Sequence, residues 1–176
     1  MMRYRSADTV VASPRNVTIF IPYGTVDSYS TTFLPGCFTR SLEAKLPPVL
    51  WNHKSDEVVG KVVGFRDRFD GLEVDIRLAD PIAVPRARMV SSLLSDEMVP
   101  GVSFGFRDGK AVPDPHHRGV TQFLSAVMDE LSFVAKPSIP GTKVLSLRHA
   151  GRGRGRGSLD VEVALARMKL NRMRHP

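Results

Sequence analysis

The stretch EVVGKVVGFRDRFDGLEVDIRLAD, residues 57–80, predicts a β-hairpin and with it the class of fold. Its turn is Asp70-Gly71, a dipeptide that favours the short turns joining antiparallel strands. Beyond this turn apolar and polar residues alternate, which is the pattern of a strand with one buried face. The residues of the apolar face are Leu72, Val74, Ile76 and Leu78.

Further extended segments lie on both sides of this hairpin. Residues 16–23, NVTIFIPY, alternate like a half-buried strand, and residues 47–53, PPVLWNH, are extended because two prolines exclude a helix. Later strands are predicted at GVSFGF (101–106), VTQFLSAV (120–127), DELSFVAKP (129–137) and GTKVLSLR (141–148). We expect a tight connection around Met128-Asp129, and a loop over 108–119 because that segment is rich in turn residues.

Two segments have a helical period instead. Residues 33–46, FLPGCFTRSLEAKL, turn at Pro35-Gly36 and then space apolar residues by four. Residues 80–98 predict a helix of about three turns, with Pro85 near its start. Strands joined mostly by short connections, with few helices, predict an α+β fold: a mainly antiparallel, β-barrel-like domain over residues 1–150.

The composition changes abruptly after this domain. Residues 151–157, GRGRGRG, cannot hold a helix or strand and predict a flexible cationic linker. Residues 158–176 predict an amphipathic basic helix, with Ser158 as its N-cap. Residues 151–176 carry seven Arg and Lys against two Asp and Glu, so they hold most of the net charge of +7. Nucleic acid is therefore a predicted partner only through this tail, not through the folded domain.

Composition also limits the compartment and the chemistry. The sequence has no apolar run long enough to cross a membrane and no signal-peptide pattern at its N-terminus. The single cysteine, Cys37, cannot form an internal disulfide, which fits a reducing cytosol, and is more typical of a small packed hydrophobe than of a nucleophile. No cofactor motif is present, and adjacent His116 and His117 with Asp114 do not have the spacing of a metal site.

Ser103 is the first candidate for chemistry, because it interrupts the otherwise apolar stretch VPGVSFGF, residues 99–106. A serine nucleophile needs a base, and His53 ends an extended stretch that would deliver it to the rim of the sheet. Asp129 and Glu130 begin a later strand, where a carboxylate could orient an imidazole. The pattern alone favours the structural alternatives: a tightly packed Ser103, a strand-end His53 bonded to backbone, and solvated carboxylates.

In this order, the segments resemble the prohead (capsid maturation) serine protease family of tailed bacteriophages, which is similar in fold to the herpesvirus maturation protease. The resemblance covers roughly residues 16–148 and is carried by FLPGCF, LWNH followed by VVGKV, DGLEVDIRL, GVSFGF and DELSFVAKPSIPGTKV. It implies Ser103 as the nucleophile, His53 as the base and Glu130 as the orienting acid. Asp129, or a histidine at 116 or 117, remains an alternative third member.

The resemblance implies a serine endopeptidase without a cofactor. It would cut the phage scaffold and major capsid protein, and also itself, inside the procapsid in the host cytoplasm, and we expect a homo-oligomer, with a dimer possible. The basic tail would dock on scaffold or shell, or simply keep the protein soluble. Two other functions stay open: an inactive assembly protein of the same fold, and a module that binds nucleic acid through the tail.

Overall fold

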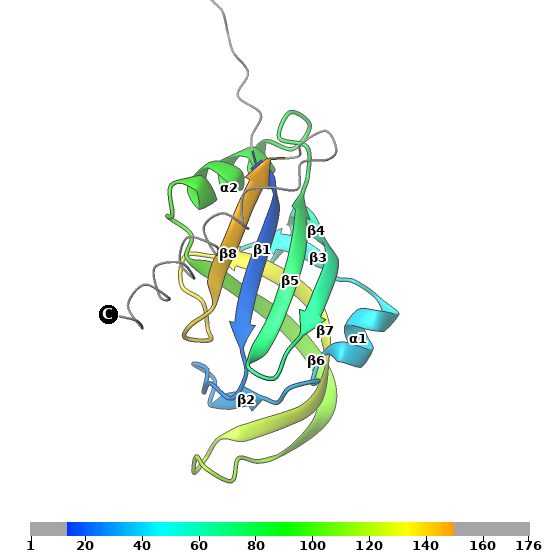
Figure 1. Ribbon diagram of the computed structural model, residues 1–176, viewed down its shortest axis with the longest axis vertical. Coiled ribbons are helices and arrows are strands. Elements are labelled where there is room, and N and C mark those ends of the chain that lie inside the picture. Colours follow the sequence, from blue (N-terminus) through cyan, green and yellow to red (C-terminus); the bar gives the residue numbers. More distant parts are fainter. Residues whose placement is uncertain (1–13, 150–176) are drawn as a thin grey trace, which may run out of the picture.

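The computed structural model in Figure 1 describes residues 14–149 of the chain. Its elements in chain order are β1 (Pro14–Pro22), β2 (Thr31–Phe33), α1 (Thr39–Ala44), β3 (Pro48–Trp51), β4 (Lys54–Asp67), β5 (Gly71–Leu78), α2 (Pro85–Ser95), β6 (Gly101–Pro113), β7 (Thr121–Val134) and β8 (Lys143–His149). The linker and the helix expected at 151–157 and 158–176 lie outside the described residues. Within residues 14–149, no helix has the length and apolar character needed to cross a membrane.

The hairpin expected at 57–80 is confirmed as β4 and β5. The two strands pair antiparallel, with Asp67 opposite Leu72 nearest the turn. The whole predicted apolar face of β5 is buried, and it joins one core with the inward residues of β1, which are Val17, Ile19 and Ile21. The helix expected near Pro85 is also confirmed, because α2 begins at that proline and buries Ala87, Val90 and Leu94.

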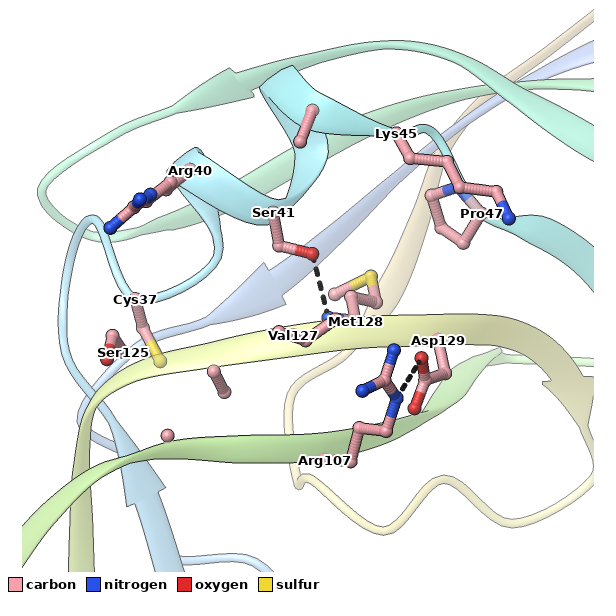
Figure 2. A pocket seen from close by; sticks show the side chains of 13 residues that line it. Cys37, Arg40, Ser41, Lys45, Pro47, Arg107, Ser125, Val127, Met128 and Asp129 are labelled. Carbon is pink, nitrogen blue, oxygen red and sulfur yellow. Dashed lines mark hydrogen bonds and ion pairs between the residues drawn. The ribbon is translucent and has the colours of Figure 1, made fainter.

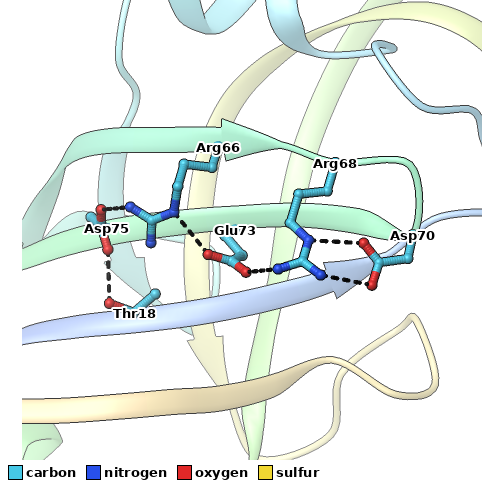
Figure 3. Close-up of polar contacts among 6 residues, drawn as sticks. All are labelled: Thr18, Arg66, Arg68, Asp70, Glu73 and Asp75. Atoms are coloured by element: carbon cyan, nitrogen blue, oxygen red, sulfur yellow. Dashed lines mark hydrogen bonds and ion pairs between the residues drawn. The ribbon is translucent and has the colours of Figure 1, made fainter. Parts of the chain in front are cut away.

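The opposite face of β1, β4 and β5 is covered by ion pairs (Figure 3). Arg66 contacts Glu73 at 2.9 Å and Asp75 at 3.0 Å, and Arg68 contacts Glu73 at 2.8 Å. Thr18 donates a hydrogen bond to Asp75 across the β1–β5 pair at 2.7 Å. Exposed pairs of this kind each add only about 0–1 kcal/mol, so this face fixes the register more than it stabilises the fold.

The sheet differs from the expected barrel. Its eight strands form one mixed sheet in the order β2-β7-β3-β4-β5-β1-β8, with β6 on the remaining edge of β7. β2 and β3 run parallel to β7, and in the described part of the chain the outer strands β6 and β8 do not pair, so the sheet is open. Connection length was a poor guide because β7 pairs with β2 and β3, which lie far from it in sequence. Over residues 14–149 the chain is mostly strand, with two short helices.

The β6–β7 ribbon is longer than expected and crosses behind the β8–β1–β5 part of the sheet before extending beyond it (Figure 1). β6 continues to Pro113 through the first half of the expected loop, and β7 is one strand rather than two. The expected connection at Met128-Asp129 is a β-bulge: Gly105 faces Glu130 and Phe106 faces Met128, so Asp129 is the extra residue. A bulge and a tight turn share the same sequence signals, which explains the wrong prediction.

The other edge of β7 is only partly covered by strands. β2 pairs with residues 121–123 and β3 with residues 131–133. Between them, α1 and the turn before it supply the hydrogen-bond partners: the Ala126 N–H donates to the Cys37 carbonyl at 2.9 Å, and the Met128 N–H donates to Ser41 Oγ at 3.0 Å. α1 therefore substitutes for a strand at this point of the sheet.

Candidate active site

His53 lies in a tight turn, not in a strand as expected. Asn52 and His53 form the two-residue connection between β3 and β4, with φ angles of 50° and 59°. Positive φ at both central residues is typical of the type I′ turn, one of the two favoured turns for hairpins of this length, and asparagine tolerates it better than most residues. For histidine the conformation is uncommon, so the surrounding contacts must hold it in place.

Those contacts come from β7. The Asn52 N–H donates to the Phe133 carbonyl at 3.1 Å, and the His53 N–H donates to Ser132 Oγ at 3.0 Å. Both acceptors belong to the segment of β7 that pairs with β3. These hydrogen bonds fix the turn against a buried strand. They therefore also fix the backbone position from which the imidazole of His53 extends.

Glu130 holds the imidazole itself. Its Oε1 lies 2.6 Å from His53 Nδ1, and its Oε2 accepts a hydrogen bond from Ser132 Oγ at 2.7 Å. The Glu130 side chain is 15% exposed, so the pair is partly shielded from water, while His53 is 46% exposed. A carboxylate at Nδ1 favours the tautomer with its proton there, which leaves Nε2 as the acceptor.

Gly105 explains how the carboxylate fits. It lies directly opposite Glu130 in the β6–β7 pair, and a Cβ at this position would come within 2.9 Å of Glu130 Oε1 and 3.1 Å of Glu130 Cγ. Because Gly105 has no side chain, the Glu130 side chain can occupy this space and reach His53.

Ser103 lies two residues before Gly105 on the same face of β6, opposite Ser132. It is 7% exposed, and its Oγ lies 3.1 Å from Ser138 Oγ. Ser103 and His53 both line one open pocket of about 470 Å³. No hydrogen bond joins Ser103 to His53 in this structure; the serine hydroxyl is engaged with Ser138 instead.

Two loops complete this pocket, and the sequence did not point to either. Asp27 organises the first by accepting hydrogen bonds from the Tyr29 and Thr31 N–H groups at 2.9 Å and 2.8 Å, and Tyr29, 78% exposed, lines the pocket. The Ser28 N–H donates to the Ser138 carbonyl at 3.0 Å, which ties this loop to the segment after β7. Only Ser132 carried a usable signal, because strand alternation places it on the face of Glu130.

The alternative third members lie elsewhere. Asp129, displaced by the bulge, contacts Arg107 at 2.9 Å. His116 and His117 lie in the loop between β6 and β7, at the far end of the ribbon from Ser103, where both N–H groups bond to Asp114. The structure thus brings together Ser103, His53 and Glu130, and not these others.

Cys37 is not poised to react. It is 2% exposed, and burial, reinforced by the nearby Asp67 carboxylate, raises the pKa of its thiol to about 12. A thiol that stays protonated at neutral pH is a poor nucleophile, so the pocket at Ser103 is the better candidate for covalent chemistry.

A hydroxyl and a carboxylate-held imidazole on one pocket are the components of acyl transfer by a serine enzyme. A solved structure of Kaposi's sarcoma-associated herpesvirus protease, in complex with an allosteric inhibitor, is 14% identical, with 88% of this chain and 89% of that chain covered and a TM-score of 0.44. No curated protein matches the sequence. The model of a protein family described as caudovirus prohead serine protease matches residues 18–152. Because this match spans most of the chain, the protein belongs to the prohead serine proteases of tailed phages, the enzymes of capsid maturation.

Proposed function

We propose that Ser103 is the nucleophile of this protease, His53 its general base and Glu130 the residue that orients His53. The observation that carries the proposal is the 2.6 Å contact between Glu130 Oε1 and His53 Nδ1, on the wall of the pocket that Ser103 also lines. Because Nδ1 is occupied, the remaining ring nitrogen is the one available to Ser103.

In this reaction His53 Nε2 takes the proton of Ser103 Oγ while the oxygen attacks the carbonyl carbon of the scissile peptide bond. The tetrahedral intermediate collapses when His53 returns that proton to the leaving amine, and the acyl group stays on Ser103. Water, deprotonated by His53, then attacks the ester and releases the acid and the free serine. Glu130 remains ionised throughout and stabilises the imidazolium.

The first step requires the Ser103 hydroxyl to break its hydrogen bond with the Ser138 hydroxyl. The two hydroxyls are 3.1 Å apart, and rotation about χ1 moves a serine Oγ between staggered positions without moving the backbone. We take the Ser103–Ser138 contact as the resting arrangement, which an entering peptide replaces. Catalytic hydrogen bonds commonly tighten only when substrate binds.

The family supports substrates among the capsid components. In this proposal the enzyme cuts the scaffold and the major capsid protein inside the procapsid, and cuts its own chain. It acts there as a homo-oligomer.

Coexpression with the phage's major capsid and scaffold proteins tests the proposal. Intact masses of every chain are compared for wild type, Ser103→Ala and the control Ser92→Ala, whose hydroxyl bonds, among the described residues, only to the Arg88 carbonyl of its own helix. We expect trimming by wild type and Ser92→Ala, and full-length chains with Ser103→Ala. Trimming that persists in Ser103→Ala contradicts the assignment of the nucleophile. Identical full-length masses in all three, with procapsids still assembled, indicate an inactive assembly protein.

A further inference from the structure

A second groove lies beside the active site, between α1 and the β6–β7 ribbon (Figure 2). Its volume is about 500 Å³, and it occupies the part of the β7 edge that α1 covers in place of a strand. Its apolar lining residues are Ala44 and Pro47 on the side of α1 and Ala126, Val127 and Met128 on the side of β7. No residue of the proposed catalytic set lines it.

The charged residues that line this groove are mainly basic. Arg40 and Lys45 lie at the two ends of α1, Arg107 comes from β6, and the one acidic residue of the lining, Asp129, is paired with Arg107. Within residues 14–149, neither Arg40 nor Lys45 forms an ion pair, and the remaining charged residue of α1, Glu43, does not line the groove. The same residues carry 16 Lys and Arg against 15 Asp and Glu, so this excess of positive charge is local.

The groove and the active-site pocket share no lining residue, but both are lined by residues of β6. Ser103, Gly105 and Arg107 are alternate residues of β6, so they share the face opposite the apolar Phe104 and Phe106. At about 3.3 Å per residue, Arg107 lies roughly 13 Å from Ser103 along the strand. On β7, Asp129 at the groove adjoins Glu130, which contacts His53. An extended peptide with its scissile bond at Ser103 can therefore reach the groove with a residue about four positions away.

We propose that this groove is a substrate subsite for acidic side chains, which bind to Arg40 at one end of α1 and to Lys45 at the other while the apolar lining accepts neighbouring residues. The inference rests on the proposed function, since it assumes a scissile bond at Ser103. A peptide fits better than nucleic acid because no aromatic side chain lines the groove, and single-stranded nucleic acid is bound mainly by stacking on aromatic rings. The enzyme would thus prefer peptides that carry Asp or Glu about four residues from the cut.

The first test measures binding, independently of cleavage. The full-length Ser103→Ala protein is titrated with two labelled twelve-residue peptides that differ only in an Asp-Glu or a Lys-Lys pair. The groove variant adds Arg40→Glu and Lys45→Glu. The control adds Arg88→Glu and Arg118→Glu, two exposed arginines away from the groove that change the net charge equally. We expect about tenfold tighter binding of the acidic peptide, retained in the control and reversed in the groove variant.

Equal affinities for the two peptides, or the same change in groove variant and control, would overturn the inference. So would a single-stranded oligonucleotide that binds more tightly than the acidic peptide and loses its affinity in the groove variant. With active Ser103, the groove variant should raise KM for acidic substrates and leave kcat unchanged, because the groove does not touch the reacting atoms. If the peptides bind as expected, but neither wild type nor the groove variant with active Ser103 cleaves them, the proposed function fails while the acidic-peptide groove stands.

Discussion

The substitution Gly105→Ala should impair catalysis while leaving the fold intact. Its Cβ would lie 2.9 Å from Glu130 Oε1, whereas an ordinary contact begins near 3.4 Å, so the carboxylate must retreat by about 0.5 Å or more. That movement acts on the 2.6 Å contact with His53 and the 2.7 Å bond from Ser132. Since a displacement of about 1 Å in a catalytic group can cost about 100-fold, we expect kcat to fall by about 10- to 100-fold.

The backbone gives no reason for misfolding. Gly105 does not have a positive φ, and the atoms that its new methyl would meet belong to one flexible side chain. We expect the free energy of unfolding to change by about 1 kcal/mol or less. Gly64→Ala is the matched control, because it is also a strand glycine and its Cβ would meet nothing closer than Asp75 Oδ2 at 3.8 Å.

The assay is steady-state cleavage of a peptide taken from a mapped site, together with thermal unfolding. If Gly105 acts through Glu130, the substitution should add little to the loss caused by Glu130→Gln, because the two changes then remove the same interaction. Wild-type kcat in Gly105→Ala, or a loss that is fully additive with Glu130→Gln, would refute the reasoning.

Three other outcomes follow from the contacts of Ser132 and from the pKa shifts of Cys37 and Asp114. Ser132→Ala removes the partner of both Glu130 Oε2 and the His53 N–H, so kcat should fall by about tenfold in the same assay, and an unchanged kcat contradicts this role. Because the pKa of Cys37 is raised to about 12, iodoacetamide at pH 8 should label the thiol only after unfolding; mass spectrometry showing rapid labelling of the folded protein contradicts it. The pKa of Asp114 is lowered to about 2, and the largest cause is the hydrogen bond from the His116 N–H. Because this folded-state pKa lies below the unfolded one, the ionised carboxylate stabilises the fold fully above about pH 4, and this stabilisation is lost as the pH falls toward 2. Asp114→Asn should therefore flatten the dependence of Tm on pH between about 4 and 2, and an unchanged slope contradicts it.

Local patterns predicted the parts of this fold whose partners are close in sequence. The Asp70-Gly71 turn and the alternation of β5 identify a hairpin because both strands are within a few residues of the turn. The parallel pairing of β3 with β7 joins Val49 to Leu131, and nothing in either short apolar segment specifies that partner. The prediction of two strands where β7 is continuous was wrong for a related reason. The twelve positions at which β7 pairs with β6 keep it in one strand through residues that, taken locally, favour a turn.

In the candidate site too, the sequence predicted the local features and not those that depend on distant residues. The sequence could place Glu130 and Ser132 on one face, because strand alternation requires it. It could not show that Asn52 and His53 form a two-residue turn, since a histidine at positive φ is held by contacts with Ser132 and Phe133 that lie about 80 residues further along the chain. The bulge that turns Asp129 toward Arg107 decides which of two adjacent carboxylates meets the imidazole, and it depends on the register with β6.

The small residues in the stretch around Ser103 each have a different neighbour. A Cβ on Gly101 would come within 2.7 Å of Thr142 Oγ1, from the segment leading into β8. Ser103 opens into the pocket, and Gly105 leaves room for Glu130. On the other face, Phe104 and Phe106 pack with Phe33 in T-shaped contacts at 5.2 Å and 5.1 Å, which hold β6 rigid. Large side chains on one face and small ones on the other suit the proposed role of Ser103. The packed face fixes the strand, and the open face leaves room for a peptide beside the serine hydroxyl.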